Sequence, residues 1–126
     1  MKSLLFFVWL FIPLALFSQK AAKPALAFDV VEIVRQDIPY DSKELFVFTF
    51  KNKGKNPLSI KSVQTSCGCT TADKPTDPVA KKGKGQISVS YDTKRVGEFV
   101  KSITVTPDLG DPIVLTIRGN VLPEKQ

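Results

Sequence analysis

Apolar and polar residues alternate along most of the chain beyond residue 25, and alternation with a period of two is typical of half-buried β-strands. The clearest example runs from Glu44 to Lys51, where Phe46, Phe48 and Phe50 share one face. The same alternation recurs in three later segments, 87–91, 99–106 and 113–121. Turn residues separate these segments, and no window has a convincing helical period. The pattern predicts an all-β fold.

Two segments depart from strict alternation. In residues 25–35 the apolar residues fall on both parities, which predicts a first strand that carries a bulge or is buried on both faces. Within residues 58–63 the apolar positions change parity. This change predicts a bulge near Lys61 and Ser62, which would re-aim the residues that follow.

Turns at short intervals and about seven strands predict an antiparallel β-sandwich of immunoglobulin-like type. The sandwich is expected to occupy residues 28–122, followed by a tail of residues 123–126. Both cysteines lie in one segment, so no disulfide can join the two sheets as it does in antibody domains.

Residues 1–18 have a different composition. Lys2 precedes an apolar run of residues 4–17 that only Pro13 interrupts, which is the pattern of a signal peptide. The run is shorter than the roughly 17 to 25 residues that a membrane-spanning helix needs. We therefore expect cleavage after Ser18, a linker of residues 19–27, no stable membrane span after cleavage, and a periplasmic or extracellular location.

Without residues 1–18 the chain has 17 basic and 12 acidic residues, a net charge of +5. A basic protein can bind nucleic acid, but an exported protein rarely meets it, so we expect no nucleic-acid partner. Many of the lysines fall in two predicted turns, residues 51–55 and 81–85. Lysines at such positions keep a protein soluble and protect strand ends from pairing. The alternative interpretation is a weak attraction to an anionic envelope polymer.

The chain lacks the usual catalytic groups. It has no histidine, which excludes cysteine–histidine and serine–histidine pairs and imidazole metal sites. Its only methionine is Met1, and it has no glycine-rich phosphate loop and no cluster of acidic residues. The sequence therefore predicts a protein that is not an enzyme and needs no cofactor.

The string Ser66-Cys67-Gly68-Cys69-Thr70-Thr71 contains both cysteines and is the candidate site. In a regular strand the side chains of Cys67 and Cys69 would point to the same face, with Cα atoms about 6.5 Å apart, which opposes a disulfide. Gly68 could let the backbone bend into unusual φ/ψ and bring the sulfurs together, giving a reducible bond. Alternatively, the two thiolates could hold a soft metal ion such as Cu(I). The third interpretation is structural, with small side chains packed at a strand end and Thr70 and Thr71 bonded to nearby backbone.

These residues carry a resemblance to a known family, the bacterial domain of unknown function family 1573. It extends over roughly residues 28–122 and rests on Phe48-Thr-Phe-Lys-Asn52, Gly54, Asn56-Pro-Leu-Ser-Ile60, Val63, the Ser66–Thr71 string, Tyr91-Asp-Thr93, Gly97, Phe99 and Leu115-Thr-Ile-Arg-Gly-Asn-Val121. The resemblance implies a small exported immunoglobulin-like domain, similar in fold to sperm-protein, ciliary and PapD-like sandwiches. One departure is the turn before Ile87, where the family often has Pro-Gly and this chain has Lys81-Lys-Gly-Lys-Gly85.

Two functions are consistent with these observations. The first is an exported, non-enzymatic module that binds another envelope protein or an anionic envelope polymer, with strand edges that could take a partner strand. The second is a thiol-based redox or copper-handling protein centred on Cys67 and Cys69.

Overall fold

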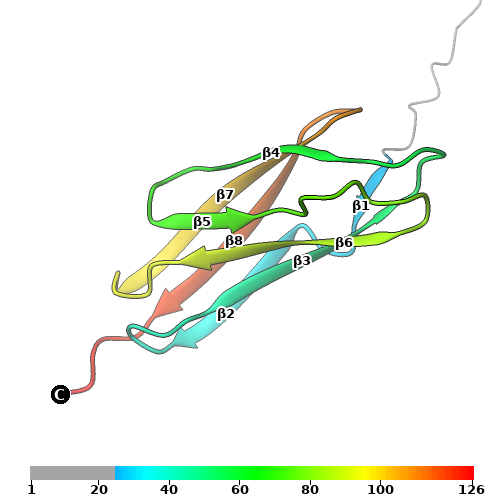
Figure 1. Cartoon of the computed structure of the whole chain (residues 1–126). Helices are drawn as coiled ribbons and strands as arrows, with labels where there is room; N and C mark the ends of the chain where they lie inside the picture. Colours follow the sequence, from blue (N-terminus) through cyan, green and yellow to red (C-terminus); the bar gives the residue numbers. More distant parts are fainter. Residues whose placement is uncertain (1–24) are drawn as a thin grey trace, which may run out of the picture.

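The computed structural model describes residues 25–126. The predicted signal peptide and residues 19–24 of the predicted linker lie outside the described residues. Eight strands form two four-stranded sheets (Figure 1). The first sheet has the order β1 (Leu26–Phe28), β3 (Leu45–Asn52), β6 (Lys84–Tyr91) and β5 (Thr70–Asp73). The second has the order β2 (Glu32–Ile38), β8 (Ile113–Val121), β7 (Gly97–Pro107) and β4 (Ile60–Thr65).

This strand order is that of an immunoglobulin-like sandwich, so the predicted fold class is confirmed. The three phenylalanines of β3 are fully buried between the sheets, as their spacing predicts. Phe48 lies opposite Ile87 of β6. Phe46 makes an edge-to-face contact with Phe99, which belongs to the other sheet, and their ring centroids are 6.2 Å apart. All buried apolar residues of the described chain lie between Leu26 and Val121. We therefore expect residues 19–126 to fold on their own.

The prediction of one strand over residues 25–35 is wrong. The segment divides into β1 and β2, which belong to different sheets, and β1 begins inside the predicted linker. Val30, Val31 and Val34 are each about half exposed, so this region is not buried on both faces. The reason is that both strands lie at sheet edges, where the neighbouring layer covers little of their surface.

The sandwich is not entirely antiparallel, because β2 runs parallel to β8. Their close approach requires glycine at position 119. A Cβ there would lie 2.7 Å from the carbonyl oxygen of Arg35 and 2.8 Å from the Phe99 ring. The other strand pairs are antiparallel, as predicted.

The predicted bulge in β4 is confirmed, since the register with β7 shifts between Ile60 and Ser62. Strand β5 is not predicted from the sequence, in which the prolines after Asp73 indicate a loop. This strand has four residues and only Thr70 is fully buried, so it carries almost no alternation signal. Within residues 25–126, no helix is long and apolar enough to cross a bilayer.

Candidate functional site

The Ser66–Thr71 string forms the corner at which the chain passes from one sheet to the other. Ser66 to Cys69 form a bend and turn between β4 and β5, and Thr70 and Thr71 begin β5. Ser66 holds one end of the corner on β7, because its N–H donates to the Ser102 carbonyl at 2.9 Å and its hydroxyl accepts from the Ser102 N–H at 3.1 Å. The other end is held where the Asp92 N–H donates to the Cys69 carbonyl at 2.9 Å.

Cys67 and Cys69 are joined by a disulfide in this structure, with Cα atoms 5.3 Å apart. The separation is shorter than in an extended strand because the corner is a turn. Gly68 does not have a positive φ, and a Cβ added there would meet nothing within 4 Å. The bend therefore forms without a positive φ at Gly68.

Two threonines tie the corner together. The Thr65 hydroxyl lies 3.1 Å from both the Cys67 and the Thr70 carbonyl oxygens, so it links the end of β4 to the start of β5. The Thr70 hydroxyl is buried, 3.6 Å from the sulfur of Cys67 and 3.7 Å from that of Cys69. Thr71 is exposed and pairs with Ser90 on β6. Thr70 thus contacts the disulfide of the corner, whereas Thr71 continues the ladder between β5 and β6.

The chemistry open to this corner is limited. Both sulfurs are half-buried, and in the disulfide neither is a thiolate, which is the form that attacks as a nucleophile or binds a metal. In residues 25–126, no group of three or more His, Cys, Asp or Glu side chains is placed to hold a metal ion. The arrangement of Cys67 and Cys69 is that of a covalently closed turn.

Tyr91 lies beside the corner, opposite Thr70 in the β5–β6 ladder. Its ring stacks on Phe99 with centroids 3.8 Å apart. Burial raises the pKa of the Tyr91 phenol, a shift that Arg95 opposes and Asp92 reinforces. The ring therefore anchors the corner to the core in its neutral form.

The corner lies at the end of β4. This strand has a free edge, which the sequence-based predictions did not identify. Among residues 25–126, strand β4 lies at the end of its sheet and pairs only with β7. Its residues from Ser62 onward are uncharged, and the run without charge continues to Ala72. Because 24% of the residues in the chain are charged, this uncharged run is the sequence feature that could have indicated the free edge.

In the part of the chain that the structure describes, the free edge of β4 presents unpaired backbone groups. Because the Ser66 N–H bonds to β7 and bonded residues alternate in an antiparallel ladder, Gln64 and Ser62 also face β7. The N–H and C=O groups of Val63 and Thr65 therefore point to the open side. A bridge between Leu58 and Val79 bounds this open stretch at its start, and the disulfide turn bounds it at its end.

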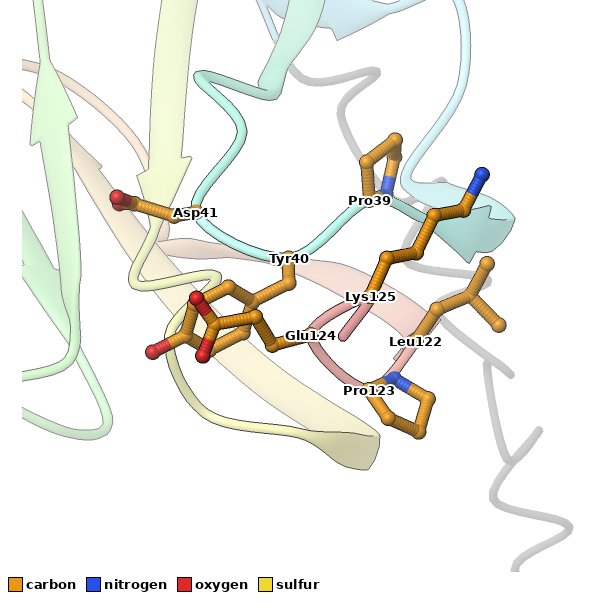
Figure 2. A pocket seen from close by; sticks show the side chains of 7 residues that line it. All are labelled: Pro39, Tyr40, Asp41, Leu122, Pro123, Glu124 and Lys125. Carbon is orange, nitrogen blue, oxygen red and sulfur yellow. The ribbon is translucent and has the colours of Figure 1, made fainter.

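A separate pocket of about 580 Å³ lies at the C-terminal end of the sandwich. It is formed where residues 122–125 lie against the β2–β3 turn, held by a 2.8 Å bond from the Leu122 N–H to the Ile38 carbonyl. Figure 2 shows its lining, in which the Asp41 carboxylate points away from the other labelled side chains. The two carboxylates of the lining, those of Asp41 and Glu124, are thus not arranged as a catalytic pair.

Comparison with solved structures agrees with this fold. A protein of unknown function from Porphyromonas gingivalis W83 has 14% identity and a TM-score of 0.61, over 82% of this chain and 51% of that one. The ASH/PapD-like domain 7 of human CEP192 has 9% identity and a TM-score of 0.61, over 91% of this chain and 99% of that domain. The YadV chaperone has 19% identity and a TM-score of 0.53, over 81% of this chain and 53% of that one.

At these identities the similarities show the fold alone. The chain spans about half the length of the Porphyromonas protein. A comparison with curated protein sequences found no match. A family of sequences described as Protein of unknown function (DUF1573) matches residues 26–121, which includes every strand and the complete cysteine corner. The chain therefore belongs to the DUF1573 family.

Proposed function

We propose that the protein is an exported, non-enzymatic module of the cell envelope that binds an extended segment of a partner protein along the free edge of β4. The observation that carries the proposal is the uncharged open edge at Val63 and Thr65. An extended peptide can add to such an edge, with main-chain hydrogen bonds supplying affinity and alternate side chains supplying specificity.

The other edges of the sandwich are less suited to this role. Strand β2 has three charged residues in seven, a register shift after Arg35, and a positive φ of 54° at Asp37. Charges and irregularities of this kind protect an edge from pairing. Strands β1 and β5 have only three and four residues. Strand β4 combines length with an absence of charge beyond Lys61.

The disulfide corner supports this role by fixing the end of β4. The Thr65 hydroxyl bonds to the corner, and the closed turn restricts the backbone directly after the edge. An edge held in its binding conformation loses less entropy when a partner strand adds. The similarity to YadV, which is named a chaperone, is consistent with a fold that binds other polypeptides. The export of the protein rests on the apolar pattern of residues 4–17.

A peptide selection tests the proposal. Peptides that bind residues 19–126 would be isolated from a random library displayed on phage. The affinity of the recovered peptides would then be measured by calorimetry. Val63→Pro removes an outward N–H and leaves the β4–β7 bonds in place, since proline is tolerated at strand edges. We expect it to weaken binding at least tenfold.

Val34→Pro is the matched control on the edge of β2. The Thr116 N–H donates to the Val31 carbonyl, so by alternation the Val34 N–H also points outward. This variant should bind as the wild type does, and circular dichroism would verify that both variants are folded. Recovered peptides that bind Val63→Pro normally, or that lose affinity for Val34→Pro instead, would refute the assignment of the edge.

A further inference from the structure

The segments around the end of β3 and the start of β6 lie at the end of the sandwich opposite the C-terminus (Figure 1), and they carry six lysines. These lysines come from two stretches that are far apart in sequence: residues 51–55, at the end of β3 and in the β3–β4 turn, and residues 81–84, in the β5–β6 connection and at the start of β6. We call them the lysine end: Lys51, Lys53, Lys55, Lys81, Lys82 and Lys84.

Buried backbone contacts hold the two lysine-bearing segments together. The Asn52 N–H donates to the Gly83 carbonyl and the Lys82 N–H donates to the Asn52 carbonyl, both at 2.9 Å. The Asn52 side chain, which is fully buried, donates to the Val79 carbonyl at 3.0 Å and to the Asn56 carbonyl at 2.8 Å. The lysines are thus displayed by a fixed scaffold.

Within the described residues, no ion pair neutralises the charge of the lysine end. Lys51 and Lys84 lie directly opposite each other across β3 and β6, an arrangement of like charges that destabilises a sheet. None of the six lysines takes part in an ion pair within residues 25–126. Lys51, Lys53 and Lys84 line a pocket of about 310 Å³ together with one acidic residue, Asp29. These features suit a ligand that brings several negative charges.

The path of the chain indicates where such a ligand lies. The Lys53 N–H donates to the Ala25 carbonyl at 2.7 Å, so the chain enters the domain at the lysine end. Only eight Cα–Cα steps separate Ala25 from Phe17, the last residue of the apolar run, a distance of at most about 30 Å. Before the expected cleavage after Ser18, an apolar run that lies in the bilayer keeps the lysine end within this distance of the lipid headgroups.

The neighbouring turn between β7 and β8 adds an apolar side chain. The Asp108 N–H donates to the Ser59 carbonyl at 2.9 Å, which places this turn at the same end. Leu109 at its tip is 69% exposed. The turn also carries Asp108 and Asp111, so the positive charge is concentrated on the sheet of β3 and β6.

We propose that the lysine end docks on the phosphate groups of an anionic lipid surface. This surface is distinct from the β4 edge, so the module could lie on a membrane and bind a partner strand at the same time. Lysines attract such a surface through charge, and the attraction falls away within a Debye length, about 10 Å at 0.1 M salt and 3 Å at 1 M.

Sedimentation with vesicles tests the proposal without the apolar run. Residues 19–126 would be mixed with vesicles of phosphatidylcholine alone, or of phosphatidylcholine with one third phosphatidylglycerol. We expect binding to the anionic vesicles only, and its loss in 1 M salt. The variant Lys53→Gln/Lys55→Gln/Lys84→Gln should bind about 100-fold more weakly, since each contacting lysine contributes roughly fivefold.

The matched control Lys43→Gln/Lys94→Gln/Lys125→Gln removes the same charge from exposed positions outside the lysine end, and should bind within about fivefold of wild type. Equal weakening by the two triple variants would show attraction by net charge and overturn the proposal. Absence of binding to anionic vesicles at low salt would also overturn it, as would binding to soluble polyphosphate in place of vesicles.

Discussion

Asn52 is the buried polar residue on which the arrangement of one end of the molecule depends. Its side chain makes three hydrogen bonds: it donates to the Asn56 and Val79 carbonyls, and its oxygen accepts from the Gly54 N–H at 2.9 Å. The substitution Asn52→Leu keeps a similar volume and removes all three bonds. Each such bond contributes about 1 kcal/mol net, so the free energy of unfolding should fall by about 3 kcal/mol.

Solvent and other contacts limit this loss. The Val79 carbonyl also accepts from the Leu58 N–H at 2.9 Å and keeps that partner, while the Gly54 and Asn56 groups are only partly buried and can reach water. Urea unfolding, followed by circular dichroism, measures the loss as a lower midpoint with an unchanged slope. Asn56→Leu, at an exposed position, is the control and should change the free energy by less than about 0.5 kcal/mol.

A second substitution at this position separates hydrogen bonding from packing. Asn52→Asp keeps the shape but replaces the amide donor with an acceptor that faces two carbonyl oxygens. Burial and these carbonyls should raise the pKa of the new carboxyl group in the folded state. The variant should then be least stable at neutral pH and recover as the pH falls toward the unfolded value of about 3.9. A free energy of unfolding for Asn52→Leu within about 0.5 kcal/mol of the wild-type value, which is the range of a neutral surface substitution, would refute this prediction. Asn52 would then not stabilise this end of the molecule.

Three further substitutions test the core, the corner and its neighbour. Phe48→Ala should lower the free energy of unfolding by about 3 to 5 kcal/mol in urea, while the exposed Val47→Ala should lower it far less. Cys67→Ser/Cys69→Ser opens a very short loop. Closing a loop of this length lowers the entropy of the unfolded chain so little that it stabilises the fold by only about 1.6 kcal/mol. Urea unfolding should therefore show a folded variant, and a loss above about 4 kcal/mol would mean that the disulfide does more than close a turn. Because burial raises the pKa of Tyr91 in the folded state, its contribution to stability is complete below pH 10.0 and falls as the pH rises through the folded pKa. Tyr91→Phe should lose this part of the pH dependence in unfolding measured by circular dichroism.

The sequence predicts the parts of the fold that depend on one buried face. Phe46, Phe48 and Phe50 repeat every second residue and all face the core. The bulge in β4 is equally readable, because an extra residue in one strand shifts the buried positions that follow it from one parity to the other.

The edges and the corner are not readable in this way. Strands β1 and β2 have few buried side chains, so alternation does not reveal that residues 25–38 divide between two sheets. The disulfide depends on a turn at residues 66–69, whereas the spacing of Cys67 and Cys69 alone is consistent with an extended strand. The role of Asn52 comes from partners up to 27 residues away, which no local pattern records.

Amide hydrogen exchange at Val63 and Thr65, measured by NMR on residues 19–126, shows whether β4 has an open edge that takes a partner strand. In the free protein these two amides should exchange much faster than that of Gln64, which faces β7. A bound peptide from the selection should slow the exchange of both. The proposed edge is wrong if Val63 and Thr65 are already as protected as Gln64, or if a bound peptide protects amides elsewhere and leaves these two unchanged.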